Sequence, residues 1–380
     1  MKNPVRIELS EYFPELPFEF GETKGKLFSS REWFELGALS GRAEIRFLIA
    51  RKNGGISAVL PFLASAPRAG GSYDHVSKVL KPALGTLWKS TDWEPAITVG
   101  SWNSGVSVPI SSGPFETDSY DVVRALLNGV SEIQGGAAQS LIWPFLDVMT
   151  ARNLAIALGQ KSVVFRYGTT AWLDTNCEHF DEYLRRFNSH RRRTILSELR
   201  RFAQSGGYVS VHPIGDVLDQ IVAILAESKS NQGGLAEVDA IKHILTMQSR
   251  VFSDRALAFC GYRDGVLHSV ATAIEYNGTL YGRSFGRRLD EQEIPFEYFV
   301  LCYYGPLRYC IERGLKTLHL GGQANVPKKQ RGSEIQGLAT LSLSKIAISS
   351  EIRQSVDQWN HRIDRPGFLE SPTLAERNND

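Results

Sequence analysis

Seven arginines lie between residues 185 and 201, and only one acid, Glu198, lies among them, which gives this stretch a formal charge of +6 against +2 for the whole chain. Apolar side chains recur there at helical spacing, so we predict an amphipathic helix pair whose second helix is capped by Ser189. Unopposed guanidinium groups repel one another without an anionic partner, and arginine offers a planar fork that suits phosphate. We therefore expect Arg191 and Arg192 to bind an anion: the phosphates of coenzyme A, a tRNA backbone or a phosphorylated substrate.

A second set of polar side chains is suited to amide formation from an activated acyl group. That reaction needs a base for the amine, donors for the oxyanion and a proton for the leaving group. Tyr304 is expected to face a cleft and donate the proton, because its neighbour Tyr303 lies on the apolar stripe of a predicted helix. The alternative is that both tyrosines are aromatic residues of the core or its rim. His319, in a predicted strand, is a candidate base, although an exposed or capped histidine is the alternative. Arg283 lies in another predicted strand and points to the cleft or to solvent.

Three more polar residues follow the last predicted core strand: Gln323, Lys328 and Arg331. Connections at the edge of a sheet are common ligand-binding sites, so we expect these three side chains to contact substrate. The alternative for residues 328–331 is a solvated loop.

Other catalytic motifs are absent or lack their context. Residues 282–286 read GRSFG and fit the GxSxG pattern of serine hydrolases, but the polar run after Ser284 predicts a loop where that motif needs a helix. The sequence has no phosphate-binding P-loop and no HExxH, so we expect no metal site. Its four cysteines form no CxxC pair, which is typical of reduced thiols in a cytoplasmic protein.

The elements that position these residues occur twice along the chain. In each half a hairpin or meander precedes a helix, and a buried strand follows. The first set is expected at 46–65, 121–133 and 140–143, and the second at 256–285, 296–311 and 315–320. Pro306 lies inside the second helix, so we expect a kink near Gly305.

Length and composition agree with a folded, two-domain chain. The 380 residues are 42% hydrophobic and 22% charged, and no apolar run is long enough for a membrane span. The N-terminus has no apolar segment typical of a signal peptide. We expect an α/β (α+β) fold of two tandem domains, 1–165 and 166–350, each a mixed, mostly antiparallel sheet flanked by helices. A C-terminal extension, 351–380, is expected to be partly disordered.

Several strings in residues 165–345 resemble the Fem-type, FemAB-like branch of the GNAT acyltransferase superfamily. The strand at 169–174 and the arginine-rich segment after it resemble the entry into that branch's second domain. Residues 280–286, LYGRSFG, are similar to its YGRYWG strand. The string from Pro295 to Gly314 resembles its PFLHFExCYY…AIExG helix, and the string from Gly321 to Gly332 resembles its GAQGEHKxxRG. The resemblance implies two GNAT-like domains, the first degenerate and the second catalytic.

The chain departs from the family pattern at several positions. Tyr298 and Val300 stand where the family has His and Glu on the helix, which makes Tyr298 a candidate substrate contact. Glu297 replaces that Glu as base only if the helix is re-phased. The coenzyme A-binding R/Q-x-x-G-x-G/A loop of ordinary GNAT enzymes is also absent, the nearest string being 283–288.

The resemblance implies an N-acyltransferase that joins an activated acyl group to a small-molecule amine acceptor. An acyl-CoA thioester is the first expected donor, since no basic coiled-coil insertion for tRNA is evident. An aminoacyl-tRNA donor is the close alternative, and a non-catalytic, anion-binding protein is the third. We expect no tightly bound cofactor and no DNA partner.

Overall fold

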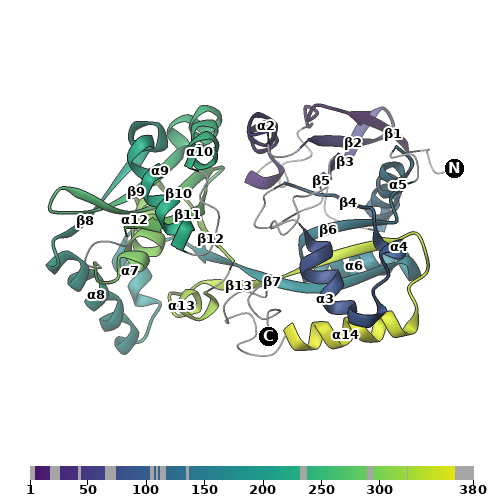
Figure 1. Ribbon diagram of the computed structural model, residues 1–380. Helices are drawn as coiled ribbons and strands as arrows, with labels where there is room; N and C mark the ends of the chain where they lie inside the picture. Colours follow the sequence, from purple (N-terminus) through teal and green to yellow (C-terminus); the bar gives the residue numbers. More distant parts are fainter. Residues whose placement is uncertain are drawn as a thin grey trace. The chain divides into compact units, whose positions relative to one another are not determined.

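The computed structural model describes residues 5–17, 26–41, 44–64, 74–102, 107, 110–111, 117–133, 137–231, 238–288, 294–322 and 324–363 (Figure 1). The chain forms two compact units. Unit 1 contains residues 1–170 and 336–380, and unit 2 is the continuous stretch 171–335. Each is described by itself below.

Unit 2 is built on a mixed, mostly antiparallel sheet with the order β7-β12-β11-β10-β9-β8. Its strands are β7 (Ser162–Asp174, which enters the unit at Ala171), β8 (Gly207–Pro213), β9 (Ala256–Arg263), β10 (Val266–Tyr276), β11 (Thr279–Arg287) and β12 (Thr317–Gly321). Strands β9, β10 and β11 form the predicted antiparallel meander. Both of its turns, Asp264-Gly265 and Asn277-Gly278, have positive φ at both positions, as type I′ turns require.

The central parallel pair of this sheet separates partway along. Strands β11 and β12 pair only from Thr279–Thr317 to Tyr281–His319, although β11 continues to Arg287. A bulge in the β10–β11 pairing lies at the same level, between Thr272 and Ala273. Backbone groups beyond Tyr281 are therefore released from the β11–β12 ladder at a point deep in the unit.

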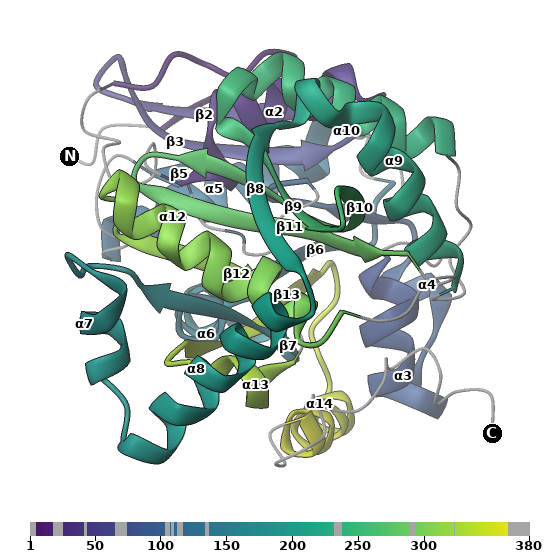
Figure 2. The ribbon, with the colours of Figure 1, turned by 90° about the vertical axis from the view of Figure 1, so that its left-hand side faces the viewer.

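Helices cover both faces of the meander (Figure 2). They are α7 (Phe180–Arg185), α8 (Ser189–Gln204), α9 (Ile214–Asn231), α10 (Val238–Phe252), α11 (Glu297–Phe299), the π turn η7 (Val300–Tyr304), α12 (Gly305–Arg313) and α13 (Asn325–Lys329). Helix α9 packs so closely on β11 that a Cβ at Gly286 would meet its backbone at 3.0 Å. On the other face, the core joins apolar side chains of α8, η7 and α12 to those of β9 and β10.

Unit 1 repeats the predicted order of hairpin, helix and strand. The hairpin is β2 (Ile45–Lys52) and β3 (Gly55–Leu63), the helix is α5 (Thr117–Ile133), and the strand is β6 (Ser140–Asp147). Its strands have the orders β1-β2-β3-β5 and β4-β6-β13-β7, the last being the part of β7 before Ala171. The other elements are β1 (Arg6–Ser10), α2 (Arg31–Leu39), η3 (Val76–Leu80), α3 (Lys81–Leu84), α4 (Ser90–Trp93), β4 (Ala96–Thr98), β5 (Ile110–Ser111), α6 (Val148–Leu158), β13 (Glu334–Ser344) and α14 (Ser350–Ile363), with short 3₁₀ turns η2 (Leu27–Ser29), η4 (Gly85–Leu87), η5 (Gly159–Lys161) and, in unit 2, η6 (Ser253–Arg255).

The C-terminal part of the chain differs from its expected place. Residues 336–350 were expected in the second domain and 351–380 in a partly disordered extension, whereas residues 336–380 group with unit 1. Strand β13 pairs with β6, and helix α14 buries Val356, Trp359 and Ile363 in an apolar core of unit 1. These three residues have the spacing of one helix face. Residues 364–380, including the end expected to be disordered, lie outside the described residues.

Within the described residues, none of the helices combines the length and the apolar character needed to cross a bilayer.

Candidate functional site

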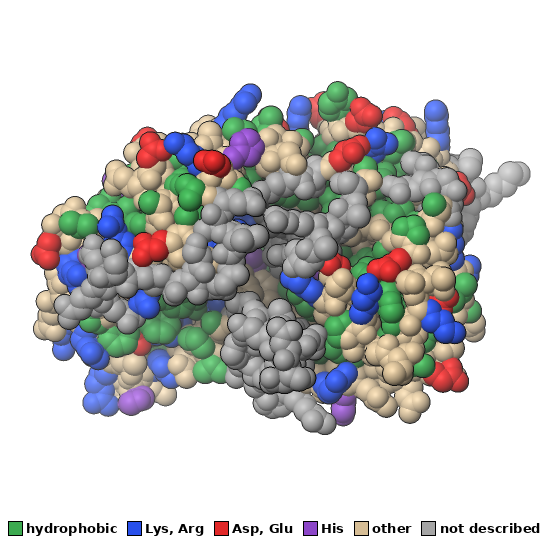
Figure 3. All heavy atoms as spheres, in the orientation of Figure 1, with side chains coloured by type: hydrophobic (Ala, Val, Ile, Leu, Met, Phe, Trp, Pro, Cys, Tyr) green, Lys and Arg blue, Asp and Glu red, His purple; other side chains and the backbone are tan. Residues whose placement is uncertain are grey.

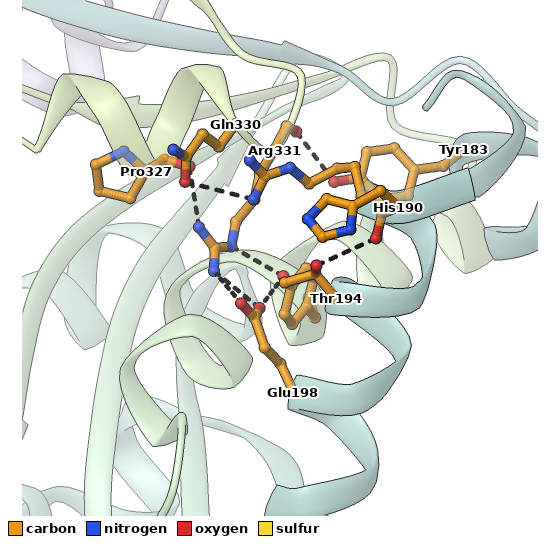
Figure 4. Close-up of polar contacts among 9 residues, drawn as sticks. Tyr183, His190, Thr194, Glu198, Pro327, Gln330 and Arg331 are labelled. Atoms are coloured by element: carbon orange, nitrogen blue, oxygen red, sulfur yellow. Dashed lines mark hydrogen bonds and ion pairs between the residues drawn. The ribbon is translucent and has the colours of Figure 1, made fainter. Parts of the chain in front are cut away.

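Three polar side chains from three elements meet inside unit 2 (Figure 4). Arg331 donates through one terminal nitrogen to both carboxylate oxygens of Glu198, at 2.9 and 2.8 Å, and through Nε to the Tyr304 hydroxyl at 2.9 Å. Tyr304 in turn donates to the Glu198 carboxylate. Glu198, Tyr304 and Arg331, which we call the Glu198 cluster, are 7%, 0% and 3% exposed. The guanidinium also lies 3.6 Å from the centre of the Phe299 ring.

The helical spacing of α8 explains why Glu198 is buried. Ile195 and Phe202, one turn before and after it, both pack in the core, so position 198 lies on the same inward stripe. A carboxylate buried on an apolar face requires a cationic partner. Glu198 was not among the residues predicted from the sequence. A lone acid on the apolar stripe of a basic helix is the pattern that could have indicated a buried carboxylate there.

The helix that carries Tyr304 contains the predicted irregularity. A five-residue π turn, Val300–Tyr304, stands directly before Gly305-Pro306, and α12 begins at Gly305. Pro306 has no N–H and would clash with the carbonyl four residues earlier, and the wider turn relieves that clash. The irregularity at the predicted place is therefore a π turn. Helix α12 ends at Gly314, whose φ of 67° is the left-handed conformation of a helix C-terminus.

Tyr304 does not face a cleft as expected. The side chains of Tyr303 and Tyr304 are both buried, because the π turn directs two successive residues into the core. Burial raises the pKa of Tyr304, and the hydrogen bond with Glu198 raises it further. A buried hydroxyl that is bonded to two charged groups orients them, which differs from the predicted proton donor.

Lys328 and Arg331 are also not part of a solvated loop. Lys328 is 2% exposed, and its ammonium donates to the carbonyls of Gly321 and Gly322 at 2.8 and 2.6 Å. Burial lowers the pKa of Lys328 to about 8, and the nearby Cys302 opposes this shift. Arg331 is bound to Glu198, to Tyr304 and to the carbonyl of Pro327, so these contacts occupy the guanidinium that was expected to contact substrate. Gln323 lies outside the described residues.

His319 and Arg283 lie where β11 and β12 separate. His319 is the last residue of β12 to pair with β11, and Arg283 follows two residues after its partner Tyr281. His319 is 1% exposed and packs against Trp172 with ring centres 4.3 Å apart. Burial lowers the pKa of His319 to about 3, and the charges of Arg283 and Lys328 add to this effect. His319 is therefore a buried, neutral imidazole at pH 7 and too weak a base for the predicted role.

Glu297 and Tyr298 begin the helix that leads into the π turn. Glu297 is 4% exposed, and its carboxylate lies 3.5 Å from the guanidinium of Arg287. Phe296, just before it, has a φ of 62°, a strained conformation for a residue with a side chain. Tyr298 is partly exposed and packs edge-on against Phe285 of β11. The start of this helix therefore presents a negative side chain.

The arginine-rich segment forms the predicted helix pair, α7 and α8. The cap of α8 is Asn188 instead of Ser189, since the Asn188 side chain accepts from the Arg191 N–H at 2.9 Å. Arg186 pairs with Asp174 and donates to backbone carbonyls at the end of β7, so it fastens α7 to the sheet. The remaining arginines pair with no acid in the described part of the chain; they are Arg185, Arg191, Arg192, Arg193, Arg200 and Arg201.

These six arginines form a basic surface along α7 and α8, which we call the arginine face. Four are exposed, while Arg191 and Arg192 are partly buried. Figure 3 shows Lys and Arg side chains gathered over α8, at the lower left. Arg191 also reaches the Gln330 amide oxygen at 3.4 Å, directly beside Arg331 in the chain. The arginine face therefore meets the Glu198 cluster at Arg191, which lies two turns before Glu198 on the same side of α8.

A protein-family model described as FemAB-like, peptidoglycan biosynthesis/recognition, matches residues 113–370, more than half of the chain. The chain belongs to the FemAB-like family. No curated protein sequence matches it. The family supports a transferase of acyl or aminoacyl groups as the class of activity.

Solved structures agree with the FemAB-like assignment at the level of fold. FemX has a TM-score of 0.59 at 12% identity, over 92% of this chain and 99% of that one. The C-terminal domain of a protein described as a lysylphosphatidylglycerol synthetase, from Agrobacterium fabrum, has a TM-score of 0.53 at 11% identity, over 91% and 96%. L-PGS from Bacillus licheniformis has a TM-score of 0.52 at 13% identity, over 90% and 95%. The expected tandem GNAT-like α/β fold is thereby confirmed.

Apart from Arg191 and Arg192 of the arginine face, the described residues that were predicted in this FemAB-like chain fall into three groups within unit 2. Tyr304 and Arg331 meet in the Glu198 cluster; His319, Arg283 and Lys328 lie at the separation of β11 and β12; Glu297 and Tyr298 begin the kinked helix. Ser284 lies in β11 and is exposed, and its backbone N–H donates to the Thr272 hydroxyl. Within the described residues, no group of three or more His, Cys, Asp or Glu side chains is placed to hold a metal ion.

Proposed function

We propose that this FemAB-like chain transfers an aminoacyl group from aminoacyl-tRNA to an amine and forms an amide bond. The arginine face carries this proposal. It presents six guanidinium groups along two consecutive helices with no acid paired to them in the described residues. A phosphate backbone supplies anions at regular spacing along such a surface.

The start of the kinked helix argues against coenzyme A as the donor. A helix N-terminus is a favourable place for a diphosphate, because its N–H groups and dipole attract anions. Here that place holds the buried carboxylate of Glu297, whose own N–H donates to the Ile294 carbonyl. The Glu297 carboxylate, paired with Arg287, thus takes the place that a diphosphate would need. The coenzyme A-binding loop of ordinary GNAT enzymes is also missing from the sequence. A thioester donor is thus the second candidate.

The separation of β11 and β12 supplies the electrostatics for the transfer step. When the amine attacks the ester carbonyl, negative charge develops on the carbonyl oxygen. Arg283 and Lys328 both act on the buried His319, so two cations lie near this point. We assign them to stabilising the oxyanion, while the proton that the attacking amine loses passes, directly or by way of Lys328, to the leaving ribose oxygen. Since the ester is already activated, the reaction needs no resident cofactor.

The test is equilibrium binding of total tRNA and of coenzyme A at two salt concentrations, followed by transfer of radiolabelled aminoacyl groups to amines. The family description makes a peptidoglycan-precursor amine the first acceptor to try. We expect salt-sensitive tRNA binding that Arg191→Ala/Arg192→Ala weakens about tenfold, with a smaller salt slope. Lys229→Ala/Arg250→Ala removes two exposed cations elsewhere in unit 2 and is the matched control.

The other outcomes are equally distinct. Saturable coenzyme A binding without tRNA affinity would replace the proposal with the thioester reaction. Binding without turnover for any donor and amine would favour the non-catalytic, anion-binding alternative.

A further inference from the structure

Glu198 is buried on α8, the helix that carries five of the six arginines of the arginine face, and we propose that it is a positioning residue for the transfer reaction. This inference rests on the proposed function. Through Arg331 and Tyr304, Glu198 fixes α8 relative to residues 324–332, the segment that holds Lys328 beside the separated strands. Donor binding by the arginines of α8 is thereby aligned with the reacting end of the donor at the separated strands.

The first step is that the Glu198 cluster is closed. Each of its three side chains bonds to the other two, and each comes from a different part of the chain: α8, the π turn, and the turn after α13, in which Arg331 is the second residue. In Figure 4 the carboxylate of Glu198 points from α8 directly at the guanidinium of Arg331. Because hydrogen bonds are directional, this closed set of three side chains opposes sliding or rotation of α8 against the π turn and the turn after α13.

The second step is that Arg331 is tied to the strand end. Lys328, three residues earlier, holds the carbonyls of Gly321 and Gly322 at the end of β12. Arg331 itself binds the Pro327 carbonyl, and its own carbonyl accepts a hydrogen bond from Tyr183 of α7 at 3.0 Å. Arg331 is thus hydrogen-bonded to α7 and to α8, and Lys328 connects the same segment to the end of β12.

The contacts of the Glu198 cluster are polar although the packing does not require it. Apolar side chains at positions 198, 304 and 331 would stabilise the same packing with less desolvation, since buried ion pairs contribute little net stability. What a buried ion pair with a third hydrogen-bonded partner adds is a unique geometry. The cluster therefore serves the alignment of two ligand-binding segments more than the stability of the fold.

The test compares three variants in tRNA binding, thermal unfolding and single-turnover transfer at saturating aminoacyl-tRNA. Glu198→Met/Tyr304→Phe/Arg331→Met replaces the cluster by apolar side chains of similar size. We expect it to unfold within a few degrees of the wild type and to bind tRNA within threefold, but to transfer at least thirtyfold more slowly. Tyr304→Phe alone, which removes one hydroxyl and folds readily, should transfer about fivefold more slowly. Arg191→Ala/Arg192→Ala should weaken tRNA binding, whereas the control Lys229→Ala/Arg250→Ala should keep the binding and the rate of the wild type.

The outcomes separate the two proposals. If the wild type transfers no aminoacyl group from tRNA, the proposed function fails and this inference fails with it. If the wild type transfers and the folded triple variant matches its rate, Glu198 is structural only and this inference alone is overturned. If the triple variant does not fold, Tyr304→Phe decides, because a wild-type rate there overturns the positioning role.

Discussion

Each unit contains a π turn within its described residues, and the two turns arise in the same way. Residues Val76–Leu80 of unit 1 precede Pro82, and residues Val300–Tyr304 of unit 2 precede Pro306. In both, the proline is the second residue after the turn. The common cause is local: a proline cannot follow an α-helical turn without losing a hydrogen bond and meeting a carbonyl.

The two turns differ in what their side chains contact. Val79 and Leu80 of the first turn join an apolar core with Trp93, Val356 and Trp359. Tyr304 of the second bonds to two charged groups, and Cys302 lies near Lys328. The π turn itself therefore indicates only that a proline follows it. What indicates the candidate site is the set of buried charged side chains that are hydrogen-bonded to one another.

The largest expected effect is at the buried charge. Arg331→Met leaves the Glu198 carboxylate buried without its cation, so we expect the free energy of unfolding to fall by about 3–5 kcal/mol. Leu80→Ala at the apolar turn should cost about 2–5 kcal/mol by the different route of cavity formation. Urea unfolding measures both. Adding Glu198→Met should recover most of the loss in the Arg331→Met protein, and failure to do so would contradict the charge explanation.

A smaller effect is expected from His319. Its pKa is about 3 in the folded state and near 6.5 when unfolded, so the unfolded chain binds more protons between these values. Stability linked to this histidine is therefore present above pH 6.5 and is lost as the pH falls toward 3. We expect a loss of about 2–3 kcal/mol by pH 4.5 relative to His319→Phe. Unfolding curves of both proteins at pH 7 and 4.5 measure it, and parallel losses would exclude His319 as the cause.

The prolines test the comparison directly. Pro82→Ala and Pro306→Ala should each change the free energy of unfolding by no more than about 1 kcal/mol. The reason is that the wider π turn already accommodates the proline, so its removal relieves no clash. The rate of transfer should fall only for Pro306→Ala, by about tenfold, since a helix free to rewind displaces the Tyr304 hydroxyl. Equal rates for the two variants would mean that the second turn has no part in the site.

The smallest effects are expected where the units are alike. Gly54 and Gly278 end matching Asn-Gly turns, with φ of 81° and 74°, and a Cβ there meets no neighbouring atom. Gly54→Ala and Gly278→Ala should therefore each cost about 1 kcal/mol through backbone strain alone. Thermal unfolding of the two variants should give nearly the same loss, and a clear difference would show that the turns are not equivalent.

Many elements of unit 2 could be predicted because they depend on residues that are close together in the sequence. Turn residues, alternating strands and the helical stripe fix the meander and the kinked helix from neighbouring residues. The arginine face was predictable for the same reason, since exposed charge needs no distant partner. Its cap was not, because Asn188 and Ser189 are both good capping residues and backbone geometry decides between them.

The Glu198 cluster depends on partners that are distant in sequence. Glu198 and Arg331 are 133 residues apart, and Tyr304 is 27 residues from Arg331. No local pattern indicates that the run around Lys328 is a short buried helix. Burial reversed the expected roles of His319, Tyr304 and Arg331, because a titrating or charged group acts differently once it is desolvated and bonded.

The discontinuity of unit 1 sets an order of assembly during translation. Unit 2 is one continuous stretch and is complete once residue 335 has been made, whereas unit 1 still lacks β13 and α14 at that point. Strand β6 must wait for its antiparallel neighbour, and Trp93 must wait for the helix that covers it. Because domains fold as their segments leave the ribosome, the inserted unit is finished before the unit that the ribosome began first.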